Sequence, residues 1–221
     1  MSRRLIALGA VLLLVVSATA ALAEPRPFRI DPNHSLVGFN IRHFFSRVPG
    51  RFKEFSGTIQ LDEKNLAASS VEVTIKSASI NTENERRDGD LRSPNFLHAD
   101  SFPNITFKST KVVPGPDKTF LIYGDLTMRG VTKAVTLEAT QTGMGEIAMG
   151  GRPPRIMAGF EAKTSVDRKD FGIVWNQTLD KGGTMLGDDV AITLQVESAW
   201  TDPNAPKPQA GQRPAPAAEK K

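Results

Sequence analysis

Apolar and polar residues alternate along most of the chain between residues 24 and 201. A run with an apolar residue at every second position is typical of a β-strand that buries one face and exposes the other to water. Several such strands in succession, separated by turns, predict an antiparallel β-sandwich or β-barrel. The clearest alternating runs cover residues 37–43, 71–75, 120–128, 156–162 and 190–196.

Turn-forming residues separate these runs. Residues 128–131, with the sequence Met-Arg-Gly-Val, lie between two runs and predict a tight hairpin in which glycine supplies a positive φ. Residues 114–117, with the sequence Pro-Gly-Pro-Asp, predict a loop. Residues 143–154 contain four glycines and two prolines, which indicates either a loop or a bend within a strand.

One polar segment, residues 81–100, interrupts the β pattern. Thr82 followed by Glu85 resembles a helix capping box, and Pro94 disfavours helix at the residue before it. We therefore predict a short helix from about Glu83 to Arg92. Inserted between the strands of a barrel, such a helix could cover one open end.

The predicted helix carries a dense group of charges. The group could bind an anion such as a phosphate head group, or it could simply be a solvated helix face, and the charge pattern favours the second explanation. Arg87 and Asp88 are adjacent and so point in different directions from a helix. We expect each of them to hold the helix to the barrel by its own hydrogen bonds. The charged residues are Arg86, Arg87, Asp88, Asp90 and Arg92.

Both ends of the chain differ in composition from the middle. Arg3 and Arg4, an apolar run over 5–16 and the Ala-Leu-Ala at 21–23 predict a cleavable secretory signal peptide over residues 1–23. An uncleaved anchor helix is the alternative, although the run is short for one. Residues 202–221 are rich in Pro, Ala and Lys and lack large apolar residues, which predicts a disordered tail. A single domain is left over residues 24–201.

Composition narrows the class further. The chain has no cysteine, so disulfides, thiol chemistry and cysteine-ligated metals are excluded. The formal net charge of +4 is small and scattered, which argues against a nucleic-acid partner. After the signal peptide no segment is apolar enough to cross a membrane as a helix, so we expect no stable membrane insertion.

The sequence offers little sign of catalysis. Motifs such as GxSxG, HExxH and the phosphate-binding loop are absent. The three histidines, His34, His43 and His98, are far apart in sequence. We expect His34 to be a hydrogen-bonding residue at a loop or strand start, and His43 to be either a pocket contact or a satisfied core histidine. We predict no metal site, no cofactor and no catalytic residues.

Several ordered motifs resemble the YceI-like family of bacterial periplasmic polyisoprenoid-binding proteins. The resemblance extends from about Phe28 to Ala199. Asp90 and the Asn-Phe-Leu at 95–97 depart from the family pattern, which leaves the preference for a ligand head group open. The matching motifs are Ile-Asp-Pro-Asn-His-Ser at 30–35, Val-Gly-Phe-Asn-Ile-Arg-His at 37–43, Arg-Asp-Gly-Asp-Leu-Arg-Ser at 87–93, Phe-Pro-Asn-Ile-Thr-Phe at 102–107, Gly-Asp-Leu-Thr-Met-Arg-Gly-Val at 124–131 and Asp-Arg-Lys-Asp-Phe-Gly at 167–172.

The resemblance implies an all-β fold, an extended lipocalin-like antiparallel β-barrel of about eight strands with a short helical insertion. It also implies a periplasmic, non-enzymatic protein that sequesters or carries a polyisoprenoid or a similar long-chain amphiphilic lipid. Candidate head-group contacts are Arg42, Arg87 and Arg92. The predicted cavity-lining residues are Val37, Phe39, Ile41, His43, Val73, Ile75, Phe107, Phe120, Ile122, Phe160, Phe171, Trp175, Ile192 and Leu194.

Two other hypotheses remain at this stage. An enzyme acting on an isoprenoid-linked quinone or lipid could use the same cavity, although no nucleophile–base pair is recognisable. An outer-membrane barrel would instead point its apolar face outward to lipid. The sequence leaves a homodimer open.

Overall fold

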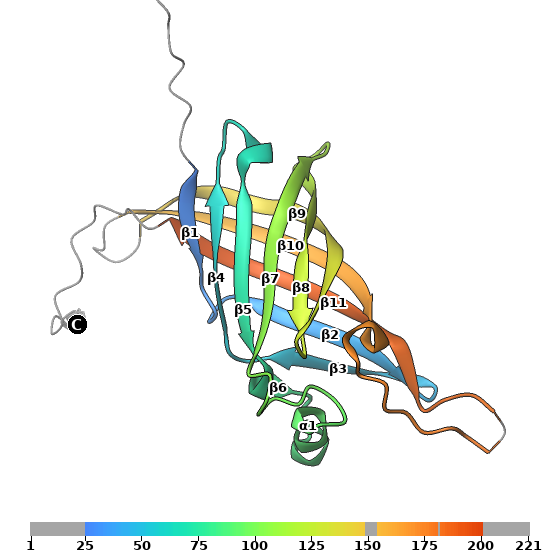
Figure 1. Cartoon of the computed structure of the whole chain (residues 1–221). Coiled ribbons are helices and arrows are strands. Elements are labelled where there is room, and N and C mark those ends of the chain that lie inside the picture. The colour runs from blue at the N-terminus through green and yellow to red at the C-terminus, as the bar shows by residue number, and fades with distance from the viewer. Residues whose placement is uncertain (1–24, 149–153, 181, 201–221) are drawn as a thin grey trace, which may run out of the picture.

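The computed structural model describes residues 25–148, 154–180 and 182–200, and most of them lie in β-strands (Figure 1). The predicted signal peptide over 1–23 and the predicted tail over 202–221 lie outside these residues. The strands are β1 (Arg26–Ile30), β2 (Leu36–His43), β3 (Ser46–Phe52), β4 (Phe55–Leu61), β5 (Ser70–Lys76), β6 (Ile80–Asn81), β7 (Asn104–Pro114), β8 (Thr119–Met128), β9 (Val131–Ile147), β10 (Arg155–Asp167) and β11 (Leu186–Trp200).

Eight of these strands close into an antiparallel barrel, which is one of the two architectures that the alternation predicts and the one that the resemblance implies. The order around the ring is β1-β4-β5-β7-β8-β9-β10-β11, and β11 pairs back with β1. The remaining strands, β2, β3 and β6, extend the sheet from β11. This extension arises because the edge of β11 opposite β10 has two partners in succession: residues 186–195 pair with β2, whereas residues 198–200 pair with β1.

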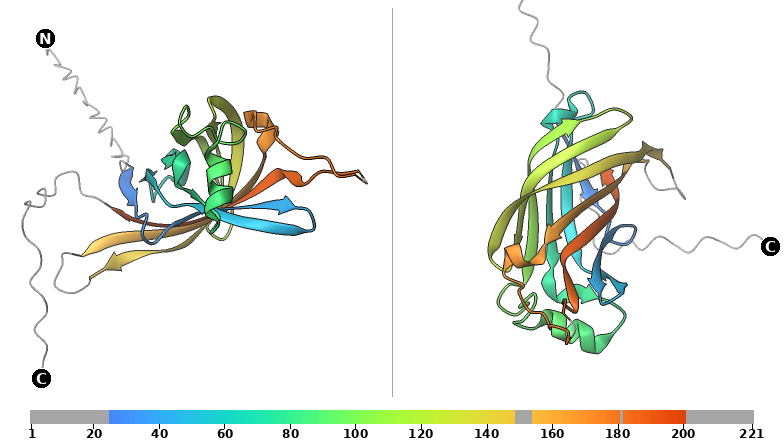
Figure 2. Two further views of the ribbon diagram at one scale, coloured as in Figure 1. Left: turned by 90° about the horizontal axis from the view of Figure 1, so that it is seen from below. Right: turned by 90° about the vertical axis from the view of Figure 1, so that its right-hand side faces the viewer.

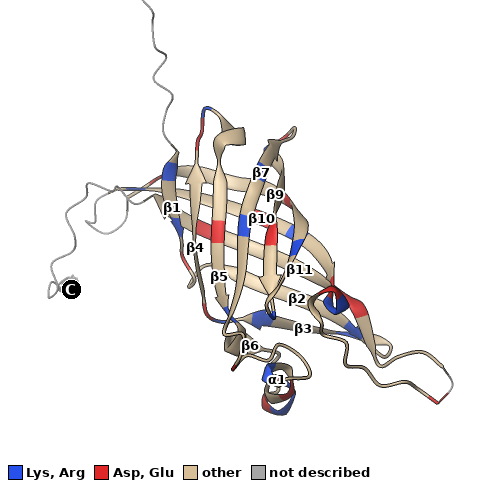
Figure 3. Cartoon of the chain, viewed as in Figure 1, with Lys and Arg blue, Asp and Glu red and all other residues tan. Residues whose placement is uncertain are grey.

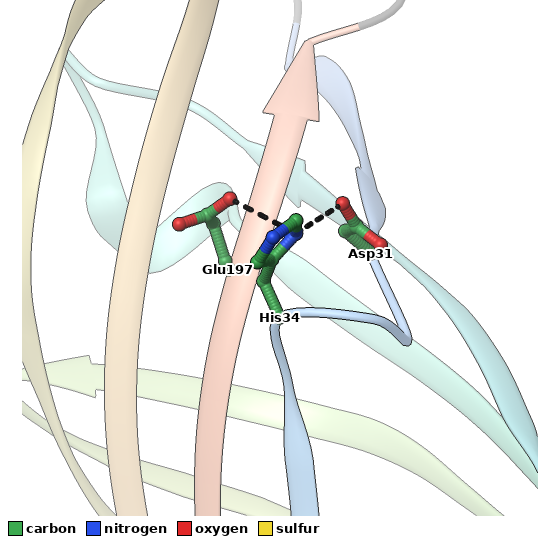
Figure 4. Close-up of side chains that lie close together, drawn as sticks. All are labelled: Asp31, His34 and Glu197. Atoms are coloured by element: carbon green, nitrogen blue, oxygen red, sulfur yellow. Dashed lines mark hydrogen bonds and ion pairs between the residues drawn. The ribbon is translucent and has the colours of Figure 1, made fainter.

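The segment between β1 and β2 is tied to β11 at this junction. The backbone N–H of Asp31 donates to the carbonyl of Glu197 at 2.9 Å, and the N–H of Glu197 donates to the Ser35 hydroxyl at 3.0 Å. His34 Nδ1 lies 2.9 Å from Asp31 Oδ2 and 3.8 Å from Glu197 Oε1 (Figure 4). His34 is therefore a hydrogen-bonding residue in the turn before β2, as the sequence predicts.

These contacts shift two pKa values in opposite directions. The hydrogen bond to Asp31, together with the charges of Asp31 and Glu197, raises the pKa of His34 above its usual value. The same hydrogen bond, aided by the backbone N–H of Asn33, lowers the pKa of Asp31. A raised histidine pKa stabilises the fold at low pH and loses that contribution as pH rises through the folded value. A lowered aspartate pKa stabilises the fold at pH values above the pKa of the unfolded state. This contribution is lost as the pH falls through the folded pKa.

We expect the substitution His34→Gln to lower the melting temperature by a larger amount at about pH 5.5 than at about pH 8.5. At the lower pH the protonated imidazole is attracted to the Asp31 carboxylate, and this attraction is lost as the pH rises through the raised pKa of His34. Thermal unfolding of both proteins across pH measures the difference. Because His34 is exposed, the effect is small, and an equal loss at both pH values would show that its charge does not contribute.

The predicted hairpin at residues 128–131 is confirmed. Met128 pairs with Val131, leaving Arg129 and Gly130 as a two-residue turn with φ values of 52° and 75°. Two successive positive φ values define the type I′ turn that matches strand twist. In the glycine-rich segment, β9 continues to Ile147 with a register shift opposite Gly159, so this part bends within a strand, while residues 149–153 lie outside the described chain.

The outward faces of the barrel strands are mostly polar, with Leu121 and Tyr123 on β8 as exposed exceptions. Lys108 pairs with Glu72 at 2.7 Å between neighbouring strands, and Lys163 pairs with Glu138 at 3.2 Å. Figure 3 shows charges of both signs along the strands. This arrangement is the reverse of the outward apolar band of an outer-membrane barrel. Separately, no helix among the described residues is long and apolar enough to span a membrane.

The helical insertion is present as α1 (Glu85–Arg92), which lies at one end of the barrel (Figures 1 and 2). The predicted start at Glu83 and the capping box at Thr82 are wrong. Asn84 is the N-cap, and its side chain accepts from the backbone N–H of Arg87 at 3.0 Å. Thr82 does not cap the helix because its backbone and side chain both bond to Asp88.

Candidate ligand-binding cavity

The barrel interior contains an apolar cavity of about 170 Å³. Nearly every wall residue is aliphatic or aromatic, and the contributing strands surround the space on all sides. Inward-facing residues of one parity along each strand produce this lining, because successive side chains on a strand point to opposite faces. The lining includes Val37, Phe55, Ile59, Val71, Val73, Ile75, Phe107, Val112, Phe120, Ile122, Leu126, Leu137, Phe160, Ile192 and Leu194.

A larger cavity of about 490 Å³ adjoins the first. Ile75 lines both cavities, so the two cavities meet at β5. The larger cavity is bounded by β2, β3, the helical insertion and the segment between β10 and β11. Its apolar lining includes Phe39, Ile41, Val48, Phe52, Ile80, Leu91, Phe96, Leu97, Ile105, Met128, Ile173, Trp175, Met185 and Leu186.

Polar side chains are concentrated in the larger cavity. They come from β2, from the helical insertion and from the start of the segment after β10. A cavity with an apolar body and a few polar groups at one side suits an amphiphile, which places its chain in one part and its head in the other. These polar residues are His43, Thr82, Arg87, Asp90, Ser93, Asn95 and Arg168.

Thr82 is the centre of a buried hydrogen-bond network at this cavity. Asp88, which is 3% exposed, accepts from the Thr82 N–H at 2.8 Å and from the Thr82 hydroxyl at 2.5 Å. Arg87 donates from Nε to the Thr82 hydroxyl at 2.7 Å and from Nη2 to the Thr82 carbonyl at 2.8 Å. Arg87 and Asp88 thus both bond to Thr82, two residues before the N-cap, and share its hydroxyl, so neither is bonded to a barrel strand by its own hydrogen bonds as we expected; Arg87 also borders the cavity.

Arg168 forms a second network, and the sequence reasoning did not identify it as a site residue. It is 2% exposed and lies in the short 3-10 helix η3 (Arg168–Phe171). Its guanidinium donates to the carbonyls of Gly187, Ile173 and Trp175 at 2.9, 2.6 and 2.8 Å, and to Asp188 Oδ1 at 3.0 Å. These bonds join the end of β10 to the start of β11 and hold Trp175 at the cavity wall. The arginine in the Asp-Arg-Lys-Asp-Phe-Gly motif was the available signal.

The predicted lining residues divide between the two cavities. Phe171 lines neither cavity. It is the last residue of η3, and its side chain is buried, with 1% exposed. The larger cavity receives Phe39, Ile41, His43, Ile75 and Trp175. The smaller cavity receives Val37, Val73, Ile75, Phe107, Phe120, Ile122, Phe160, Ile192 and Leu194.

The predicted head-group arginines are placed differently from one another. Arg87 lines the larger cavity, but Arg42 and Arg92 do not. Arg42 is exposed and donates to the carbonyls of Phe44 and Thr184 at 3.2 and 3.3 Å. Arg92 donates to the carbonyls of Ala78 and Ile80 at 2.9 and 3.3 Å, which fastens the end of α1 to β6 and to the turn before it.

A closed antiparallel barrel around adjoining apolar cavities defines a lipocalin-like class of cavity-bearing proteins. The profile of the YceI-like domain family matches residues 28–198, so the chain belongs to the YceI family. Protein YceI of Shigella flexneri is 44% identical over 161 residues, which are 72% of this chain and 82% of the relative.

Solved structures share the fold. A Campylobacter jejuni YCEI protein is 30% identical, with a TM-score of 0.62 over 73% of this chain and 90% of the other. A polyisoprenoid binding domain from Saccharophagus degradans matches with a TM-score of 0.55 over 79% of this chain and 98% of the domain. Its 13% identity makes it a likeness of fold alone.

Proposed function

We propose that this protein is a periplasmic carrier that binds a polyisoprenoid or a similar long-chain amphiphilic lipid inside the barrel. The observation that carries the proposal is the pair of adjoining cavities, one apolar and the other apolar with polar groups at the helical insertion. The polyisoprenoid binding of the domain from Saccharophagus degradans supports the same ligand class. The expected signal peptide supports export.

The energetics suit a chain-like ligand. Removing about 300 Å² of apolar ligand surface from water is worth about 7.5 kcal/mol, at roughly 25 cal/mol per Å². Part of this is offset by the loss of translational and rotational freedom on binding. The remaining affinity suits a carrier, which must both take up and release its lipid.

The head group belongs, on this proposal, beside the helical insertion. Asp90 and the residues at 95–97, where the sequence departs from the family pattern, all line the larger cavity. Among the cations that line this cavity Arg87 is the nearest to them in sequence, but its guanidinium already bonds to Thr82. An acidic Asp90 in the wall disfavours a multiply charged anionic head. We therefore propose a neutral or weakly charged head group.

A catalytic role for the same cavity is the alternative function. The Arg87 and Arg168 guanidinium groups that border the cavity donate to protein oxygens and so act in structure. His43 lies edge-on to Phe44, with ring centroids 4.5 Å apart. A carrier requires no more than the apolar walls provide, and the binding function is favoured for that reason.

Native mass spectrometry of the full chain, purified without detergent or added lipid, tests the proposal. We expect a second species heavier than the protein by the mass of one long-chain amphiphile, which extraction then identifies. When a lipid of known mass is added, a carrier should release that lipid unchanged. An enzyme would instead release a product of different mass. A protein that stays ligand-free after incubation with polyprenols and isoprenoid quinones would contradict the carrier function.

A further inference from the structure

Two exposed aromatic side chains form the turn between β2 and β3. His43 pairs with Ser46, so Phe44 and Phe45 are the two turn residues. Phe45 is fully exposed, and Phe44 is 38% exposed. Large apolar side chains at a solvent-exposed hairpin tip lower solubility and add nothing to a core, which marks them as an interaction site.

The backbone at this turn is also unfavourable for phenylalanine. Phe44 has a φ of 48°, in the left-handed region where glycine or asparagine is the cheapest residue. Two-residue hairpins ordinarily use glycine, asparagine or aspartate at such positions. A bulky aromatic residue held there by its surroundings is therefore better explained by function than by stability.

The turn is held firmly against a neighbouring segment. The N–H of Phe44 donates to the carbonyl of Met185 at 2.8 Å, and Arg42 donates to the carbonyls of Phe44 and Thr184. The end of the β2–β3 hairpin (residues 41–48) and, from the segment before β11, the described residues 176–180 and 182–186 project together from one side of the barrel (Figures 1 and 2). We call these two segments the arm.

The same arm forms part of the wall of the larger cavity. From the β2–β3 hairpin come Ile41, His43 and Val48, and from the neighbouring segment come Met185 and Leu186. His43 lies in the wall and is adjacent in sequence to the exposed Phe44. The aromatic tip therefore continues an apolar surface that begins inside the cavity.

Cationic residues flank the tip. Arg42 and Arg47 are paired across the two strands, directly behind the turn, and both are exposed. Within the described residues neither forms an ion pair with a carboxylate. Asp180 is the exposed acidic residue on the arm. Aromatic side chains with cations behind them match the chemistry of an anionic bilayer surface, where rings enter the interface and cations meet the phosphates.

We propose that the arm docks onto an anionic lipid bilayer, with Phe44 and Phe45 in the interface and Arg42 and Arg47 against the head groups. The larger cavity then faces the membrane from which a lipid is loaded or to which it is delivered. The purpose of this docking rests on the carrier function proposed above, whereas docking itself is independently measurable. Two rings and two cations give weak, reversible binding, which suits a shuttle.

Vesicle flotation tests the proposal. The full chain is mixed with vesicles of phosphatidylglycerol and phosphatidylethanolamine, and separately with phosphatidylcholine vesicles. We expect flotation with the anionic vesicles that weakens as salt is added, and a loss of about tenfold or more in the double variant Phe44→Ser/Phe45→Ser. Arg47→Gln should weaken binding to the anionic vesicles. The control Leu121→Ser removes another exposed apolar residue, 40% exposed on β8, and should float like wild type.

The single variant Phe45→Ser guards against misfolding, because the side chain it removes is fully exposed. Unchanged flotation of both Phe variants would overturn the proposal. Wild type that fails to float, yet carries lipid in native mass spectrometry, would overturn docking and leave the carrier function standing. Wild type that floats but never carries lipid would overturn the carrier function and leave docking standing. A dimer by light scattering that the Phe variants dissociate, without vesicle binding, would assign the arm to self-association and overturn docking.

Discussion

Phe39→Asp is expected to yield a folded protein from which the lipid is absent. Phe39 lies on β2 and lines the larger cavity, with its ring 5.9 Å from that of Phe52. It also covers Gly50, where a Cβ would come within 2.2 Å of the Phe39 ring. A carboxylate at this position would oppose the ligand chain, and an unpaired charge buried against hydrocarbon costs several kcal/mol.

The same substitution in a solid core would unfold the protein. A cavity of about 490 Å³ has room for water once the lipid has left, so the carboxylate can be hydrated and the barrel retained. Circular dichroism reports the fold, and native mass spectrometry reports the lipid. An unfolded variant would show that Phe39 belongs to a packed core rather than to a ligand cavity.

Asn40→Asp is the matched control. Asn40 follows Phe39 on the same strand and points to the opposite face, and it lines neither cavity. The substitution adds the same charge outside the barrel, so the variant should fold and keep its lipid. Lipid loss in Asn40→Asp alone would mean that the ligand lies on the other face of β2.

The alternation of apolar residues predicted an antiparallel sandwich or barrel, because alternation within each strand shows which of its faces is buried. The choice of the barrel came from the resemblance. The β5 sequence Ser-Val-Glu-Val-Thr-Ile-Lys places Val73 and Ile75 in the cavity and Glu72 and Lys76 outside. The β8–β9 hairpin was predictable for the same reason, because its turn depends only on the two adjacent residues Arg129 and Gly130. Parity also shows why Arg42 is outside the cavity: it lies between Ile41 and His43, which point inward.

The extension by β2, β3 and β6 could not be predicted in this way. It depends on β11 having two partners, and pairing between residues some 150 positions apart leaves no local signal. Phe171 illustrates the same limit. Its apolar character is consistent with a cavity wall, but the 3-10 turn directs it into packed protein. The hydrogen bonds of Arg92 to Ala78 and Ile80 likewise depend on where α1 meets the barrel.

Arg168→Met is expected to produce the largest loss of stability. Methionine fills a similar volume but donates no hydrogen bond, so three carbonyls, one buried and two partly buried, lose their partner at once. Removing one partner of a buried, hydrogen-bonded charged interaction typically lowers the free energy of unfolding by about 3–5 kcal/mol. For a domain of this size such a loss lowers the melting temperature by roughly 10 °C or more. The three carbonyls belong to Gly187, Ile173 and Trp175.

Two further variants separate the stability contributed by the guanidinium hydrogen bonds of Arg168 from that contributed by its positive charge. Arg168→Lys keeps the charge but replaces a planar five-donor group by one ammonium, so most of the loss should remain. Lys169→Met removes the exposed cation that also contacts Asp188, at 2.7 Å, and should cost less than about 1 kcal/mol. The Asp188 pKa, which the Lys169 hydrogen bond lowers most, should then move back toward its usual value.

The Arg168 substitution also reaches the cavity, because the carbonyl of Trp175 is one of the three and its ring packs 5.3 Å from Phe96. Without the guanidinium, the segment 173–175 is free to move away from the cavity wall. Tryptophan fluorescence should shift toward the red, and lipid retained through purification should decrease below the melting transition. If Arg168→Met matched wild type in melting temperature and in lipid content, water would be satisfying the three carbonyls, and the arginine would not be what holds Trp175 against the ligand.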